Sequence, residues 1–351
     1  MPKSKTSYRQ HSEISRYFDF NMLLTSIFAL IALLLCSKAF AVDSKLIRID
    51  GSSTVYPITE AVAEEFQKVD SEKTKVIVGI SGTGGGFKKF CRGETDLQNA
   101  SRPIQQSEID ACKAAGIKFF ELPVGFDAIV LAVHRSNTWL KEITIAELKK
   151  IWEPEAQGKI TKWNQVNPKW PDAPIKLFGA GSDSGTFDYF TEAVVGKAKS
   201  SRGDYTASED DNTLIQGISS EKNSLGYIPM SYYGENKAKI RALLVVNPTT
   251  KIGVLPSKEV VENGTYQPFS RPLFIYISET SAKRPEVKKF TEFYLSNAAK
   301  LVEQVKYVAL PEKVYSMAIE HFKKGKNGTV FQGHSEVGMK IEDLMKREGK
   351  F

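Results

Sequence analysis

The chain has 351 residues, a length that exceeds what one hydrophobic core usually organises, so two domains are expected. Its 48 Lys and Arg against 41 Asp and Glu give a formal net charge of +7. This excess is mild, and no basic patch with interleaved aromatic residues stands out, which argues against a nucleic-acid partner.

Residues 1–41 predict a secretion signal that is cleaved after Ala41. Four basic residues precede an apolar run at residues 22–35, and Ala39-Phe40-Ala41 supplies a small-residue cleavage site. The run of about 14 residues is shorter than the roughly 20 that a spanning helix needs. We therefore expect an exported, periplasmic protein; a membrane anchor, or a lipid on Cys36, are the alternatives.

Six apolar runs, several rich in β-branched residues, predict strands, and helical periodicity fills much of the sequence between them. The predicted strands are residues 46–50, 76–80, 128–134, 175–180, 243–246 and 273–277. This alternation predicts an α/β fold built from parallel β-α-β units.

Three segments have clear helix signals. Val62 and Phe66 lie four residues apart with glutamates largely on the other side, as an amphipathic helix requires. Thr144, with Glu147 three residues later, has the spacing of a capping box. The charged segment at residues 339–351 predicts a solvated helix or tail.

Cys91 and Cys112 are the pair of cysteines that remains once residues 1–41 are removed. An even number in an oxidising compartment makes a disulfide plausible, and closing a loop of about 20 residues would stabilise the fold by roughly 3 kcal/mol. Two buried free thiols are the alternative.

Three short turns combine glycine with hydroxyl residues: residues 51–54, 81–86 and 181–186. Each follows a predicted strand and precedes a predicted helix. A helix N-terminus presents unpaired N–H groups and the positive end of the macrodipole, and glycine lets an anion approach the backbone. Together the turns predict a site for one small oxyanion.

The motifs of the common catalytic sites are missing from these turns. Residues 81–86 lack the ending of a phosphate-binding P-loop, and Phe87 breaks the dinucleotide fingerprint. Asp183 stands where a nucleophile elbow would have serine. The histidines outside the signal show no metal-ligand spacing, so we expect no metal, no cofactor and no enzyme activity, and the hydroxyls act as ligand donors.

Five segments, in this order and spacing, resemble the periplasmic phosphate-binding protein of the phosphate ABC transporter, the PstS type. They are residues 49–57, 82–86, 99–104, 125–128 and 183–187. Any one of them alone would be a weak signal. The resemblance covers essentially the whole chain after the signal.

This resemblance implies a two-lobed Venus-flytrap protein, type II-like, in which each lobe has a mostly parallel sheet flanked by helices. Lobe one would comprise residues 42–125 and 273–351, and lobe two residues 126–272, with hinge crossings near 122–127 and 267–273. It also implies a monomer that binds inorganic phosphate with high affinity and delivers it to an inner-membrane permease with a cytoplasmic ATPase.

Carried over to this chain, the family's ligand donors are the Ser53 hydroxyl, the Thr54 and Gly185 backbone N–H groups, and the Thr83, Ser184 and Thr186 hydroxyls. Each hydroxyl taken singly is better explained as a helix cap than as a ligand donor. Three turns together, in the family's order, favour the ligand role.

Two departures from the best-known members shift the charge of the expected site. This chain has Ala180 where they carry an arginine before the third turn, and Arg102 where they carry an aspartate. Arg102 could pair with phosphate oxygens in a charge-assisted, bidentate manner. A surface ion pair is its alternative role.

The missing aspartate leaves the selectivity group open, because in the family it accepts a hydrogen bond from protonated phosphate and so rejects fully ionised sulfate. Asp127 and Asp183 are the acceptors we consider, with Ser101 in support. Alternatively, Asp183 caps a helix and Asp127 braces Arg102. A receptor for sulfate or another tetrahedral oxyanion is the first functional alternative; a secreted phosphatase or phosphate-responsive signalling protein is the second.

Overall fold

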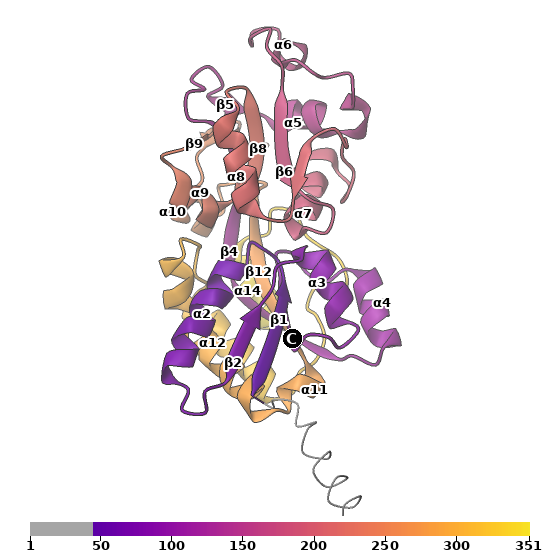
Figure 1. Cartoon of the computed structure of the whole chain (residues 1–351), viewed down its shortest axis with the longest axis vertical. Helices are drawn as coiled ribbons and strands as arrows, with labels where there is room; N and C mark the ends of the chain where they lie inside the picture. The colour runs from indigo at the N-terminus through magenta and orange to yellow at the C-terminus, as the bar shows by residue number, and fades with distance from the viewer. Residues whose placement is uncertain (1–44) are drawn as a thin grey trace, which may run out of the picture. The chain divides into compact units, whose positions relative to one another are not determined.

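The computed structural model describes residues 45–351 (Figure 1). The predicted signal at residues 1–41 and Cys36 lie outside these residues. Within the described part of the chain, no helix is long and apolar enough to cross a membrane.

Strands and helices alternate along most of the chain. The strands are β1 (Leu46–Gly51), β2 (Lys75–Val78), β3 (Leu97–Ala100), β4 (Phe119–His134), β5 (Glu142–Ile143), β6 (Lys176–Ala180), β7 (Thr206–Ser208), β8 (Ser224–Pro229), β9 (Ile240–Ala242), β10 (Leu244–Val246), β11 (Gly253–Val254) and β12 (Ser270–Ser278). The helices are α2 (Tyr56–Val69), α3 (Gly82–Phe90), α4 (Gln106–Ala114), α5 (Ile145–Trp152), η1 (Pro154–Ala156), α6 (Trp163–Val166), α7 (Gly185–Val195), α8 (Asp211–Ser220), α9 (Met230–Asn236), α10 (Lys258–Glu262), α11 (Glu279–Ala282), α12 (Pro285–Gln304), α13 (Glu312–Lys323) and α14 (Ile341–Glu348).

One long sheet runs through the described residues in the order β2-β1-β3-β12-β4-β8-β6-β7, with β9 paired to β4. The pairs β1 with β3, β6 with β7 and β6 with β8 are parallel. β4 and β12 are antiparallel to each other and to their neighbours β3, β8 and β9. A small second sheet has the order β11-β10-β5.

The elements gather into two lobes, which confirms the two-lobed α/β fold. Figure 1 shows β1, β2, α2, α3, α4 and α12 in one lobe and β6, β8, α5, α7, α8 and α9 in the other, with β4 and β12 between them. The predicted crossings at residues 122–127 and 267–273 fall within β4 and around the start of β12. Locating a hinge requires a comparison of the open and closed conformations, so the hinge positions and lobe boundaries stay a prediction.

β4 and β12 lie at the centre of the hydrophobic core. Every residue of β12 is buried, and in β4 only His134, at the end of the strand, is not. Charged residues inside such strands must be paired or hydrogen-bonded, because an isolated buried charge is costly. Asp127 in β4 and Arg271 in β12 are two such buried charged residues, so their hydrogen-bond partners must be identified.

All six predicted strands are present, and their ends agree within a few residues except for β4, which begins at Phe119 and not near the expected residue 128. The capping box is also confirmed, because Thr144 Oγ1 accepts from the Glu147 N–H at 3.1 Å and Glu147 Oε2 accepts from the Thr144 N–H at 2.9 Å. The sequence patterns missed β3, a short and polar strand, and also β5, β7, β8, β9 and β11. The expectation of a solvated C-terminal segment was wrong for one face of α14, where Ile341 and Leu344 are buried.

Cys91 and Cys112 form a disulfide that joins the end of α3 to α4. Both residues are buried, and they lie 21 positions apart in the sequence. The alternative of two free thiols is therefore wrong. The bond ties together two helices that flank β3.

Replacing both cysteines by serine should lower the free energy of unfolding by about 3 kcal/mol, because the unfolded chain gains the freedom of a loop of about 20 residues. Urea denaturation of the Cys91→Ser/Cys112→Ser variant measures this difference. Dithiothreitol should destabilise the unsubstituted protein by a similar amount and leave the double variant unaffected. Equal stability of the two proteins under oxidising conditions would contradict the expected contribution.

Candidate functional site

The three turns of glycine and hydroxyl residues lie together between the lobes. Residues 51–54 connect β1 to α2, residues 81–86 lead from β2 into α3, and residues 181–186 connect β6 to α7. In an α/β fold the crevice at the carboxyl ends of the strands is where ligands bind, because helix N-termini face it.

The first and third turns meet through their hydroxyl groups. Thr54 Oγ1 and Thr186 Oγ1 are 3.1 Å apart, and both residues are buried. Tyr232 in α9 donates its hydroxyl to the Ser53 carbonyl at 3.1 Å. The first turn is thus held by two elements of the opposite lobe.

The second and third turns pack closely at Gly185. A Cβ at this position would lie 2.5 Å from Thr83 Oγ1 and 2.6 Å from Ser101 Oγ, so a side chain does not fit. The Thr83 and Ser101 hydroxyl oxygens are 3.2 Å apart. The Gly84 N–H donates to the Asp183 carbonyl at 2.8 Å.

Ser184 is the N-cap of α7. Its Oγ accepts from the Thr186 N–H at 3.0 Å, which leaves the hydroxyl hydrogen free to donate to another group. The capping role and the ligand role of this serine are therefore compatible. The structure brings the predicted donors of the three turns together: Thr54 lies beside Thr186, and Thr83 lies beside Gly185 and Ser101, which follows β3. Ser53 and Ser184 are the sequence neighbours of these residues.

Arg271 is the guanidinium that lies beside these hydroxyls, and the sequence patterns did not single it out. Its Nη2 donates to Thr186 Oγ1 at 2.8 Å and to Thr54 Oγ1 at 3.3 Å. Its Nε and Nη2 both bond Asp127 Oδ2, at 3.0 and 2.7 Å. Arg271 and Asp127 are fully buried, yet Nη1 of Arg271 has no hydrogen-bond partner in the described protein.

The position of Arg271 follows from strand register. In the antiparallel pairing of β12 with β4, Arg271 lies directly opposite Asp127. One signal was available, since a lone arginine interrupts the apolar run of β12 inside the predicted crossing at residues 267–273. Its partner, 144 positions away, gave no local signal.

Arg102 follows β3 and is almost fully buried, but its donors already have protein partners. Nη1 and Nη2 form a bidentate pair with Glu108, each at 2.8 Å, and Nη1 also bonds the Pro103 carbonyl. Nε bonds Asp188 in α7 at 2.7 Å. The alternative of a surface ion pair does not describe this buried group, and direct contact with phosphate stays a prediction.

The two acidic residues considered as acceptors lie in different surroundings. Asp127 braces Arg271 and not Arg102, and its Oδ1 accepts from the Met230 N–H at 3.0 Å. Asp183 is partly exposed and forms an ion pair with Lys88 at 2.7 Å. Because Ser184 caps α7, Asp183 does not have the capping role that was its alternative.

Asp211, at the start of α8, is a further acid beside the first turn that sequence reasoning missed. It is buried, and its Oδ2 has no hydrogen-bond partner in the described protein. Burial raises the pKa of Asp211 to about 7, against the opposing effects of the Ser53 hydroxyl and of Arg271. The acid therefore titrates near neutral pH.

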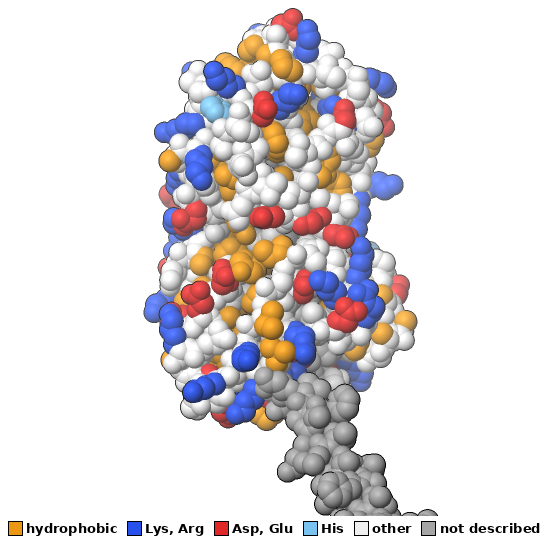
Figure 2. Space-filling model, viewed as in Figure 1, with side chains coloured by type: hydrophobic (Ala, Val, Ile, Leu, Met, Phe, Trp, Pro, Cys, Tyr) orange, Lys and Arg blue, Asp and Glu red, His pale blue; other side chains and the backbone are white. Residues whose placement is uncertain are grey.

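The rim and the interior of the inter-lobe region differ in charge. Figure 2 shows acidic side chains along the boundary between the lobes on the face in view. Positive charge for an anion must therefore come from inside, from buried arginine and helix N-termini. Within residues 45–351, no cluster of three or more His, Cys, Asp or Glu side chains could hold a metal ion.

Comparisons with known proteins agree with this geometry. Residues 37–298 match the PBP superfamily domain. Protein SphX of Synechococcus elongatus is 53% identical over 304 residues, which cover 87% of this chain and 89% of SphX. The phosphate-binding protein PstS of Staphylococcus saprophyticus is 38% identical over 270 residues, 76% of this chain and 81% of that protein.

Among solved structures, a phosphate ABC transporter substrate-binding protein from Clostridium perfringens with bound phosphate is 27% identical, with a TM-score of 0.64. The match covers 76% of this chain and 100% of that chain. The resemblance that the sequence motifs indicated is confirmed: the chain belongs to the PBP superfamily and, within it, to the family of PstS-type phosphate-binding proteins.

Proposed function

We propose that this protein captures inorganic phosphate between its lobes and delivers it to an inner-membrane ABC permease with a cytoplasmic ATPase. It would act in the periplasm, after removal of residues 1–41. The observation that carries the proposal concerns Arg271, which lies beside the hydroxyls of Thr54 and Thr186. Its buried Nη1 has no hydrogen-bond partner in the described protein. The name of the Staphylococcus relative and the phosphate in the Clostridium structure support it.

The proposed ligand set combines one charge with neutral donors from both lobes. Arg271 supplies the charge, and the donors are Ser53, Thr54, Thr83, Ser184, Gly185 and Thr186, with Ser101 in support. The hydroxyls of Thr54 and Thr186, which now bond each other, would donate to phosphate oxygens instead. Oriented N–H groups and macrodipoles at helix starts favour an anion without adding buried charge.

Closure of the lobes would complete this set, because each lobe holds only part of it. β4 and β12 are the strands that would bend at the hinge, near residues 122–127 and 267–273. A ligand that bonds both lobes favours the closed state over the open one. We propose that the protein acts as a monomer, because a single chain carries all the proposed donors.

We propose Asp211 as the group that recognises the proton of phosphate. It lies beside Ser53 and has a buried oxygen without a partner, whereas both oxygens of Asp127 are bonded and Asp183 is at the surface. An ionised Asp211 would accept from protonated phosphate and repel fully ionised sulfate. In this proposal, Asp211 takes the role of the family's aspartate, whose position in the sequence is occupied here by Arg102.

Binding, and not catalysis, is the activity we propose. The hydroxyls of Thr54 and Thr186 bond each other and Arg271, and neither bonds a histidine. His134 bonds Ser136, and His321 lies in α13 next to Glu348, so neither is placed to activate these hydroxyls.

Isothermal titration calorimetry of the purified protein tests the proposal directly. We expect one phosphate per chain, with sulfate bound much more weakly because it offers no proton to Asp211. Equal binding of sulfate would favour the receptor for another oxyanion. Turnover of a phosphate ester that persists through purification would favour the secreted phosphatase.

Arg271→Lys should weaken phosphate binding by about ten- to a hundredfold, because lysine keeps the charge for Asp127 but loses the additional donor, and a hydrogen bond to a charged group is worth about 1.5–3 kcal/mol. Calorimetry measures the change. Arg202→Lys is the matched control: Arg202 is also buried and pairs with a single aspartate, Asp204, away from the turns. Equal losses in the two variants would remove Arg271 from the site.

Asp211→Asn should raise the affinity for sulfate relative to phosphate, on the order of tenfold, because the amide no longer repels a fully ionised anion. In the unsubstituted protein, discrimination should weaken as the pH falls below the Asp211 pKa of about 7, since protonation removes the same repulsion. Competition titrations from pH 8 to pH 6 measure both effects. Unchanged rejection of sulfate by the variant would show that another group selects phosphate.

A further inference from the structure

Arg102 connects the two lobes through a buried arrangement of one guanidinium and two carboxylates. Glu108 lies in α4, in the same lobe, and Asp188 lies in α7, in the opposite lobe. Arg102 and Asp188 are each about 1% exposed, and the Phe87 ring lies 5.8 Å from the guanidinium carbon. The contact is therefore dry and cannot be a solvated rim pair.

The two carboxylates hold different edges of the same guanidinium. Glu108 bonds Nη1 and Nη2, which orients Arg102 within its own lobe whatever the position of the other lobe. This leaves Nε to point across the boundary at Asp188 Oδ2, 2.7 Å away. Arg102 is thus oriented in advance for a partner that approaches with the second lobe.

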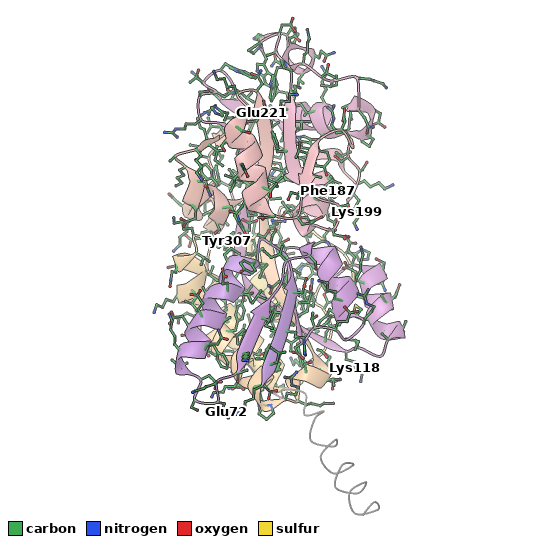
Figure 3. The ribbon with its side chains drawn as sticks, viewed as in Figure 1. Glu72, Lys118, Phe187, Lys199, Glu221 and Tyr307 are labelled. Carbon is green, nitrogen blue, oxygen red and sulfur yellow. A yellow bond between two sulfur atoms is a disulfide. The ribbon has the colours of Figure 1, made fainter. Side chains whose placement is uncertain are left out.

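Asp188 depends on this contact when the lobes are together. Its Oδ1 has no hydrogen-bond partner in the described protein, and the nearest other cation is Lys199, at 4.0 Å, at the edge of the same lobe (Figure 3). Burial raises the pKa of Asp188, and Arg102 acts in the opposite direction. A buried carboxylate without its partner would be costly, so separation of the lobes must either hydrate Asp188 or leave it unpaired.

Asp188 also lies in the first turn of α7, directly after the third turn. Its N–H donates to the Ser184 carbonyl at 3.2 Å. The bond of Arg102 to Asp188 therefore joins the first lobe to the helix start that presents Gly185 and Thr186.

We propose that the Arg102–Asp188 pair is a closure latch, which holds the third turn against the second and so retains the anion. Arg102 is then a positioning residue and Arg271 the arginine that contacts phosphate. The latch rests on the proposed function for its role in retention, but its effect on the lobes does not require phosphate. The structure gives it a matched counterpart in Glu108, which bonds the same guanidinium without crossing the boundary.

Asp188→Ala and Glu108→Ala test the latch as a pair. Each removes one carboxylate from Arg102 in the first turn of a helix, and each leaves the guanidinium with one carboxylate. Glu108→Ala also removes the acceptor of the Gln105 N–H at the start of α4, which thermal unfolding will register as a loss of stability. Nitroxide labels on Glu72→Cys and Glu221→Cys, which lie in opposite lobes (Figure 3), report the separation of the lobes by electron paramagnetic resonance. Stopped-flow release of phosphate reports retention.

In phosphate-free protein, Asp188→Ala should shift the label distances to longer values. Glu108→Ala loosens the orientation of Arg102 but keeps its bond across the boundary, so it should shift the distances less. Phosphate release should become at least about tenfold faster in Asp188→Ala, because breaking a buried charge pair acts mainly on dissociation. Release from Glu108→Ala should be accelerated less than release from Asp188→Ala, because the bond between Arg102 and Asp188 remains. Thermal unfolding of both variants checks that they remain folded.

The latch is refuted if Asp188→Ala leaves distances and release unchanged, or if Glu108→Ala changes both to the same extent. The second result would mean that Arg102 only stabilises its surroundings. If the unsubstituted protein does not bind phosphate, the proposed function fails while the label distances still decide whether the pair holds the lobes together.

Discussion

The buried ion pair between Arg271 and Asp127 is the interaction on which the rest of the site depends. It joins the two central strands, β12 and β4, at the level where the three turns meet. Because Asp127 compensates the charge, a guanidinium can lie in the core, with two donors shared among Asp127, Thr54 and Thr186 and a third left over. Such a pair is weak support for stability, and its unused donor points to a ligand.

Around this pair, the fold combines two kinds of contact between the lobes. Hydroxyl groups and backbone donors of the turns surround the arginine and are suited to exchange their partners for an anion. The Arg102–Asp188 pair is instead a direct bond between charged side chains of the two lobes. In the functions that we propose, this division would separate recognition, which needs exchangeable neutral donors, from retention, which needs a fixed buried contact.

The local features of this protein were predictable from its sequence, and the long-range pairings were not. The turns at residues 51–54, 81–86 and 181–186 are marked by their own composition, since glycine and hydroxyl residues are needed at those backbone positions. Arg271 acquires its role from the register of two strands 144 positions apart, and Arg102 from acids on two different helices. β3 escaped detection because Gln98 and Asn99 break the apolar pattern of a buried strand. Their buried amides bond the Thr83 carbonyl and the Thr59 hydroxyl, respectively.

A crystal structure of the phosphate complex tests the central claim most directly. The account predicts both Arg271 Nη atoms within about 3 Å of phosphate oxygens, with the Thr54 and Thr186 hydroxyls turned from each other onto the anion. Arg102 should still bond Glu108 and Asp188. Phosphate bound to Arg102, with Arg271 bonded only to Asp127, Thr54 and Thr186 as it is now, would contradict it.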